Sequence, residues 1–223
     1  MRYKALFIDF YGTLVYEDDN VIAKIVTQIS HISPENPDPK DIAVFWWNTF
    51  RSLFENSFLD TFQLQRQLES LSIKTVLEHY NCTTKTEGID SELFTFWGKP
   101  DIFPETKDFL TKISLPVCIV SNIDRKDILA AMNYHELSCD MVITSEDAKS
   151  YKPREEIFLM ALDKMNLSPS EVLHVGDSLS SDIVGANSCG IDSFWLNRKG
   201  RSIPSDISPT YSGNSLFDIL SIL

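Results

Sequence analysis

Short apolar runs that end at polar residues recur along this chain, and they constrain its fold more than any other feature. An uninterrupted apolar run of this length is typical of a strand buried on both faces of a parallel sheet. Helical patterns separate most of these runs, and this alternation predicts a doubly wound, parallel-sheet (Rossmann-like) α/β domain. The apolar runs occupy residues 3–10, 115–122, 140–145, 171–177 and 191–197, and the helical patterns occupy 124–134, 153–166 and 180–189.

The helical patterns carry start and stop signals. Asp124 and Asp127 stand at the start of one helix like a capping pair. Pro153 occupies a position suited to a first helical turn, and Gly190 follows the pattern that we expect to end there. The tail, residues 215–223, predicts a short amphipathic helix that closes the core.

The segment after the first apolar run reads differently from the rest. Two long helical patterns, residues 41–58 and 64–80, follow without strand signals. We therefore predict a helical cap at 16–97, inserted after the first strand, and an α/β core made of 1–15 and 98–223. Four aromatic side chains of the first long helical pattern are expected to belong to the core of the cap: Trp46, Trp47, Phe50 and Phe54.

The net charge of −12 argues against a nucleic-acid partner, because phosphate backbones bind surfaces rich in Lys and Arg. An anionic small-molecule substrate would need a local positive site within this negative field. The chain has no apolar span of about 18 residues, and its start lacks the pattern of a signal peptide. We therefore expect a soluble, cytoplasmic protein without a membrane partner. Nothing in the sequence indicates its oligomeric state.

Polar residues stand where the predicted strands end, and in open α/β sheets these ends meet along one edge where ligands bind. The convergence of these residues is the main functional prediction. They are Asp9 and Thr13 after the first strand, Ser121 and Asn122 after the second, Lys152 before a helix, and Asp177 and Asp182 after the fourth strand.

Four motifs in this order, "DFYGT", "VSN", "YKP" and "GDSLSSD", resemble those of the haloacid dehalogenase-like hydrolase superfamily. The resemblance covers essentially the whole chain and implies that the insertion is the small helical cap of that superfamily. It also implies that Asp9 is a nucleophile forming a covalent aspartyl intermediate, and that Lys152 neutralises its charge. Thr13, Gly12, Ser121 and Asn122 would bind the anionic group, the last two at a helix start.

Three carboxylates suit a hard divalent cation, and Mg²⁺ is the ion that we expect. Asp9, Asp177 and Asp182 would hold it. The resemblance adds the backbone carbonyl of Tyr11 to this set, because the residue two positions after the nucleophile supplies that ligand in the superfamily.

Tyr11 leaves the chemistry open. Phosphatases of the superfamily usually carry a second Asp at this place, whereas the dehalogenase branch carries Tyr and needs no metal. The motif "GDSLSSD" has the metal-binding form, so a Mg²⁺-dependent phosphatase acting on a small phosphorylated metabolite is preferred. A 2-haloacid dehalogenase and a catalytically weak binding homologue remain alternatives. A phenol can donate a proton but is a poor base, so Tyr11 does not supply the base that the second Asp provides. An acidic residue at the start of the cap could take that role: Glu17, Asp18 or Asp19.

Two further groups of side chains carry weaker signals. Arg51 and Arg66, the only arginines of the insertion, match no halide-binding arginine of the dehalogenases. His79, His135 and His174 lack metal-ligand spacing and are expected to be structural.

Overall fold

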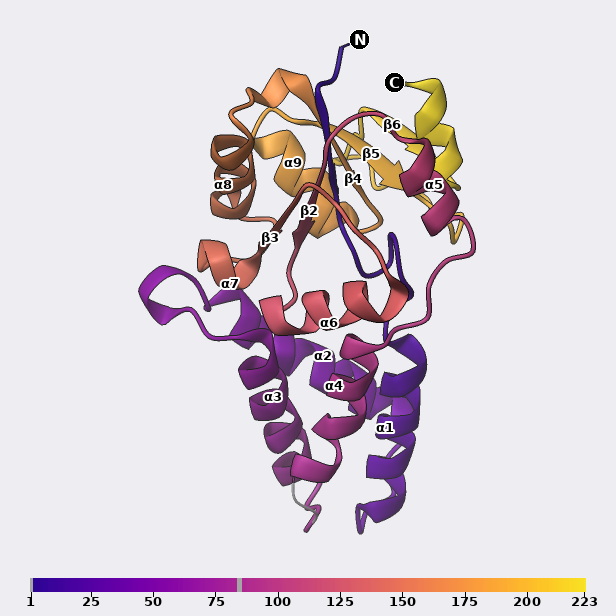
Figure 1. The fold of residues 1–223 in the computed structure, drawn as a ribbon. Helices are drawn as coiled ribbons and strands as arrows, with labels where there is room; N and C mark the ends of the chain where they lie inside the picture. Colours follow the sequence, from indigo (N-terminus) through magenta and orange to yellow (C-terminus); the bar gives the residue numbers. More distant parts are fainter. Residues whose placement is uncertain (1, 84–85) are drawn as a thin grey trace.

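The computed structural model, which describes residues 2–83 and 86–223, is built around a six-stranded sheet of parallel strands in the order β3-β2-β1-β4-β5-β6 (Figure 1). This confirms the predicted α/β fold. The order in which the chain adds strands reverses at β1, because β2 and β3 are added on one side of it and β4 to β6 on the other. The strands are β1 (Ala5–Ile8), β2 (Val117–Ser121), β3 (Met141–Thr144), β4 (Val172–Gly176), β5 (Asp192–Leu196) and β6 (Tyr211–Gly213).

The apolar runs are continuous because both faces of the sheet are covered. Along β1, Leu6 and Ile8 belong to one buried cluster and Phe7 to another on the opposite face. The first face is covered by α5 (Thr106–Lys112), α6 (Arg125–His135) and a C-terminal 3-10 helix (Leu216–Ser221), and the second by α8 (Glu155–Met165) and α9 (Gly185–Ser188). Strand residues pointing either way are therefore removed from water.

Three details of the core differ from the prediction. Helix α8 begins at Glu155, so Pro153 lies before it and follows Lys152 through a cis peptide bond. A π-helical turn (Leu179–Val184) precedes α9 where one regular helix was expected, and its Asp182 side chain accepts the Ser178 backbone N–H. The short helix α7 (Ser145–Ala148) and strand β6 were not predicted.

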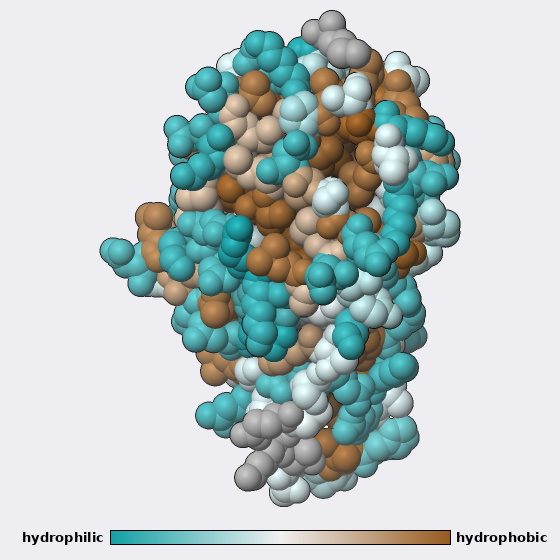
Figure 2. All heavy atoms as spheres, viewed as in Figure 1, coloured by the Kyte–Doolittle hydropathy of each residue, from teal (hydrophilic) through white to brown (hydrophobic). Residues whose placement is uncertain are grey.

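The segment between β1 and α5 forms a bundle of helices beyond the carboxyl ends of the strands (Figure 1). On the face shown in Figure 2 the bundle is largely hydrophilic, whereas apolar side chains gather over the sheet region. The helices are α1 (Asp19–Ile32), α2 (Pro39–Glu55), α3 (Gln65–His79) and α4 (Asp90–Gly98), with 3-10 turns at Leu59–Thr61 and Thr86–Gly88.

Two chain segments lie side by side where the chain passes between the sheet and the bundle, one at residues 15–16 and the other at residues 101–102. Val15 pairs with Ile102 in an isolated antiparallel bridge, and the Tyr16 N–H donates to the Asp101 carbonyl over 2.8 Å. We propose that the boundaries between core and cap fall within these segments. Of the helices in residues 2–83 and 86–223, none combines the length and the apolar character needed to cross a membrane.

Candidate active site

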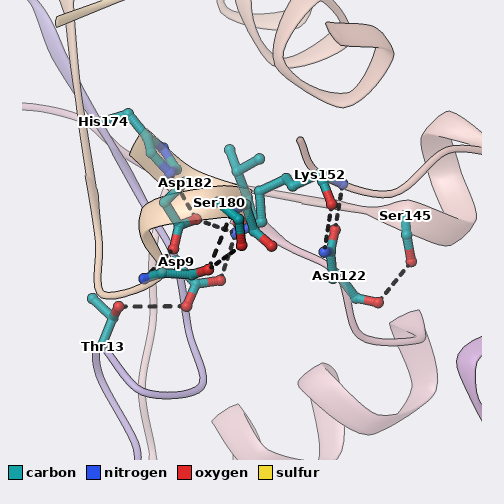
Figure 3. Close-up of polar contacts among 11 residues, drawn as sticks. Asp9, Thr13, Asn122, Ser145, Lys152, His174, Ser180 and Asp182 are labelled. Carbon is teal, nitrogen blue, oxygen red and sulfur yellow. Dashed lines mark hydrogen bonds and ion pairs between the residues drawn. The ribbon is translucent and has the colours of Figure 1, made fainter. Parts of the chain in front are cut away.

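A buried lysine lies at the centre of the polar residues that converge at the strand ends (Figure 3). The Lys152 Nζ lies 2.6 Å from Asp9 Oδ1 and 2.6 Å from Asp182 Oδ1, and it donates to the Val120 carbonyl over 2.8 Å. The Thr13 hydroxyl donates to the other Asp9 oxygen over 3.4 Å. Residues that are 143 positions apart in the chain therefore share one ion-pair network.

The network distributes charge unevenly between its carboxylates. Burial raises the pKa of Asp9 to about 7, although Lys152 opposes this shift. Burial would also raise the pKa of Asp182, but Lys152 and the His174 imidazole outweigh it and lower this pKa to about 2. Burial alone would lower the pKa of Lys152, whereas the attraction of Asp182 and Asp9 raises it. We therefore describe Lys152 as an ammonium ion held between two carboxyl groups.

Two glycines let the carboxyl groups approach closely. Gly12 has a φ of +87°, and a Cβ there would lie 2.3 Å from Asp177 Oδ1. A Cβ on Gly176 would lie 2.2 Å from the Asp182 Cγ. Any side chain at these two positions would push the carboxylates out of place. As a result, one oxygen from each of Asp9, Asp177 and Asp182 lies within 4.8 Å of the others.

The donor set of this cluster fits a hard divalent cation. Three carboxyl groups face the Lys152 ammonium group and the half-exposed Arg201 guanidinium, which lies 3.6 Å from Asp177 Oδ2, so negative charge still exceeds positive charge. The effect is visible at Asp177, where burial first and then Glu17, Asp182 and Asp9 raise the pKa to about 8. Oxygen-only donors and this excess of negative charge suit Mg²⁺. Asp182 carries the most protein donors of the three carboxylates. Its oxygens bind Lys152, His174 and Ser178, whereas those of Asp9 bind Lys152 and Thr13.

Ser121 and Asn122, expected at the anion-binding helix start, line the same cavity as Asp9. The Asn122 side chain, however, is already engaged with the backbone of residue 152. Its amide donates to the Lys152 carbonyl over 3.1 Å, and its oxygen accepts the Lys152 N–H over 2.7 Å. This side chain fixes the loop that presents Lys152. Asp124 also differs from its expected capping role, because it accepts the N–H groups of Gln65 and Arg66 at the start of α3.

The Tyr11 side chain points to the segment that returns from the bundle. Its phenol donates to the Trp97 carbonyl in a short hydrogen bond, and the Trp97 indole donates to Asp18 over 2.8 Å. Burial, followed by the nearby Asp127 and Asp18, raises the pKa of Tyr11 well above its ordinary range. The neutral phenol therefore links the core to α4, whose Trp97 in turn binds Asp18 before α1.

A cavity of about 570 Å³ opens above the carboxylate cluster, between the sheet and the bundle. Glu17 and Asp18 line it, whereas Asp19 pairs with Lys199 over 3.0 Å. Three of the four aromatics expected in the cap core also line it: Trp47, Phe50 and Phe54. The expectation that these aromatics form the bundle's own core is therefore wrong for Trp47, which is 61% exposed, although Trp46 is buried as expected.

The comparison with protein families decides the classification. The family described as haloacid dehalogenase-like hydrolase matches residues 3–190 of the chain. The chain belongs to this hydrolase family. The expected resemblance is thereby confirmed, and so is the hydrolase class of the protein.

Relatives of this haloacid dehalogenase-like hydrolase carry out different reactions. Pyrimidine 5'-nucleotidase YjjG of Escherichia coli is 38% identical over 85 residues, which cover 38% of this chain and only 38% of YjjG. Pyrophosphatase PpaX of Bacillus mycoides is 24% identical over 100% of this chain and 98% of its own. The crystal structure of L-2-haloacid dehalogenase RSc1362 has a TM-score of 0.81 at 19% identity, covering 100% of this chain and 99% of the other. These proteins include a nucleotidase, a pyrophosphatase and a dehalogenase. The similarity therefore establishes the family of the chain and does not decide between a phosphatase and a dehalogenase.

Sequence reasoning missed the contacts of two residues at this hydrolase site. His174, expected to be only structural, places its Nε2 3.0 Å from Asp182 Oδ1 and so helps to hold the partner of Lys152. Trp97 binds both Tyr11 and Asp18. The position of His174 within β4, three residues before Asp177, was the available signal for the first contact. No local pattern marks Trp97, because its partners lie 86 and 79 residues away.

Proposed function

We propose that this protein is a Mg²⁺-dependent phosphatase that acts on a small, anionic phosphorylated metabolite. The observation that carries the proposal is the placement of Asp177 beside Asp9 and Asp182, with one oxygen of each within 4.8 Å of the others. Without a cation these carboxylates would repel one another and the incoming phosphate. A metal-free reaction at Asp9 would have no use for the extra carboxylate that Gly12 admits so closely.

The proposed chemistry has two displacements at phosphorus. An Asp9 carboxylate oxygen forms a bond to phosphorus, while the bond between phosphorus and the leaving-group oxygen breaks and its electron pair stays on that oxygen. The leaving oxygen takes a proton from a donor in the cavity. Water then forms a bond to phosphorus while the bond from phosphorus to the Asp9 oxygen breaks, its electron pair returns to the carboxylate, and phosphate leaves with the protons of the water. Thr13 and Lys152 stabilise the charge on the transferring group, and holding both reactants in line supplies much of the acceleration.

We propose that Asp9, Asp177 and the backbone carbonyl of Tyr11 hold the ion, with Asp182 behind them. Because the Asp182 oxygens accept from three protein donors, Lys152, His174 and Ser178, its main role in this proposal is to hold the ammonium group in place. When bound, the ion supplies positive charge that offsets the carboxylates and the phosphoryl oxygens.

The relatives support phosphate chemistry but also keep a second candidate. A nucleotidase and a pyrophosphatase both release phosphate or cleave phosphate bonds, as their names state. Tyr11 is the observation that favours a 2-haloacid dehalogenase, together with the fold shared with RSc1362. A dehalogenase would use Asp9 on carbon and would not depend on a cation.

Removal of the metal separates the two candidates. Phosphate release from acetyl phosphate is expected to fall at least about 100-fold in EDTA and to return when Mg²⁺ is added in excess, because the carboxylate cluster then regains its counter-charge. Phosphate is measured colorimetrically, and chloride release from 2-chloropropionate is measured beside it. Chloride release that is indifferent to EDTA would select the dehalogenase. Absence of both products over a broad substrate panel would favour a binding homologue.

Tyr11→Asp is expected to increase turnover of alkyl phosphate monoesters by at least about 10-fold, because a carboxyl group can act both as acid and as base. The wild-type enzyme is expected to prefer good leaving groups such as acyl and aryl phosphates, since its phenol is bonded to Trp97. The assay compares glycerol phosphate with acetyl phosphate. Tyr11→Phe also removes the phenol but adds no carboxyl, so it serves as the matched control and should show no such gain. An absence of gain in Tyr11→Asp would contradict this account.

A further inference from the structure

One face of helix α2 presents aromatic side chains to the cavity that contains Asp9. Trp47, Phe50 and Phe54 recur at intervals of three and four residues, which places them on one side of the helix. All three line the cavity, together with Arg51 from the same face. The usual reason for such a stripe, packing against another helix, does not hold for Trp47, which is 61% exposed.

The aromatic stripe is continuous and leads toward the reactive residues. Ring centroids are 6.4 Å apart between Trp47 and Phe50, 5.6 Å between Phe50 and Phe54, and 4.2 Å between Phe54 and Tyr151. Tyr151 is buried and directly precedes Lys152, whose ammonium group binds Asp9. A row of π-faces therefore runs from the mouth of the cavity to the neighbour of the central lysine.

The reactive end of this row is fixed in place. The Tyr151 hydroxyl donates to the Gln63 carbonyl over 2.7 Å, which joins the core to the segment between α2 and α3. Phe62, from the same segment, stacks on Tyr151 with ring centroids 5.2 Å apart. Tyr151 is thus a fixed support for Phe54, the innermost ring of the stripe, which a ligand in the cavity need not order first.

The polar residues that line the cavity away from Lys152 offer no free positive charge for a second phosphate group. Glu17 and Asp18 line it, and Arg51 is already paired with Glu55 over 2.7 Å. The volume of about 570 Å³ exceeds what a bare phosphate group needs and lies in the usual range of small-molecule sites. Beyond the reactive residues, the cavity is therefore lined by aromatic rings together with acidic, hydroxyl and amide side chains.

We propose that the aromatic stripe of Trp47, Phe50 and Phe54 binds a flat ring in the leaving group, so that the substrate is a phosphate monoester of the nucleoside monophosphate kind. This inference rests on the proposed phosphatase function and deepens it by naming the substrate class. Stacking of a base on an aromatic side chain contributes about 1–3 kcal/mol, which corresponds to roughly 5- to 150-fold in affinity. Trp47 is the specificity-determining residue, because its large face is free for a ligand.

The test compares uridine 5'-monophosphate with ribose 5-phosphate, with Mg²⁺ present. The first carries a flat uracil ring at the sugar carbon where the second carries a hydroxyl group. The wild type is expected to favour the nucleotide at least about 10-fold in kcat/KM, and Trp47→Ala is expected to lose most of this preference. Trp47→Phe, which keeps a ring, should retain it. Tyr134→Leu is the control, because Tyr134 is a 56% exposed aromatic on α6 that does not line this cavity. Equal kcat/KM values for both ligands, or a preference untouched by Trp47→Ala, would overturn the inference.

Binding of the same two ligands, measured by calorimetry, keeps this result separate from the fate of the proposed function. Equal phosphate release from both ligands would leave the phosphatase standing and refute the aromatic subsite. Selective binding of the nucleotide without any phosphate release would refute the phosphatase and support the subsite. Neither release nor selective binding would refute both.

Discussion

Asp9→Asn is expected to lower kcat for phosphate release at least about 10³-fold, because the amide that replaces the carboxylate is not a nucleophile. The substitution is nearly isosteric: the amide oxygen can keep the Lys152 ammonium group as its donor, and only the longer 3.4 Å bond from the Thr13 hydroxyl loses its acceptor. The loss should therefore appear in kcat far more than in thermal stability. Initial rates with acetyl phosphate and Mg²⁺ provide the measurement, and thermal unfolding of the same samples checks the fold.

A covalent readout makes this result specific. In acid-quenched wild-type reactions, the peptide that contains Asp9 should gain the mass of one phosphoryl group, and this species should be absent from Asp9→Asn. Asp163→Asn, an exposed carboxylate on α8, is the matched control and should keep wild-type turnover. Full turnover by Asp9→Asn, or a phosphoryl group on another residue, would remove the basis of the proposed mechanism.

Lys152→Met is expected to have the second largest effect, on activity and stability together. The ammonium group is buried between Asp9 and Asp182, so its loss leaves two carboxylates facing each other without a counter-charge. Removing one partner of a buried ion pair typically costs about 3–5 kcal/mol of unfolding free energy. Turnover should fall at least about 100-fold, since transition-state charge loses a fixed positive partner.

Urea unfolding and steady-state kinetics measure the two effects of Lys152→Met separately. Lys164→Met, which changes an exposed lysine of α8, is the matched control, and it should change the unfolding free energy by less than about 0.5 kcal/mol. A Lys152→Met protein as stable as the control would show that the buried carboxyl groups are neutral in the folded protein. That outcome would contradict the ion-pair network described above.

The sequence was most informative where chemistry is local. The apolar runs at 3–10 and 171–177 predicted strands because a strand buried on both faces needs apolar side chains in every position. The strand ends predicted the meeting of Asp9 with Lys152 and Asp182, because parallel strands bring their carboxyl ends to one edge. The π-helical turn at Leu179–Val184 escaped prediction, since an apolar stripe of helical period does not distinguish it from a regular helix.

The same limit explains the error at α2. Helical periodicity identified the aromatic stripe, but it cannot tell whether a neighbouring helix or a cavity lies opposite. The Trp46 side chain is buried and its indole donates to the Ser72 hydroxyl over 2.9 Å, whereas Trp47, one residue later, lines the cavity. A difference of one residue on a helix is a rotation of about 100°, so the direction of each face depends on how the whole helix docks.

The sequence by itself determined the α/β class, the order of the strand-end motifs and the chemical types that gather at the site. Only the tertiary structure decided that Tyr11 binds Trp97, that Asn122 holds the loop of Lys152, and that Asp177 fits against Gly12. The first group follows from short-range pattern, since burial and backbone geometry act on neighbouring residues. The second depends on contacts between residues 86, 30 and 165 positions apart, whose distances are set only when the sheet and the bundle have packed.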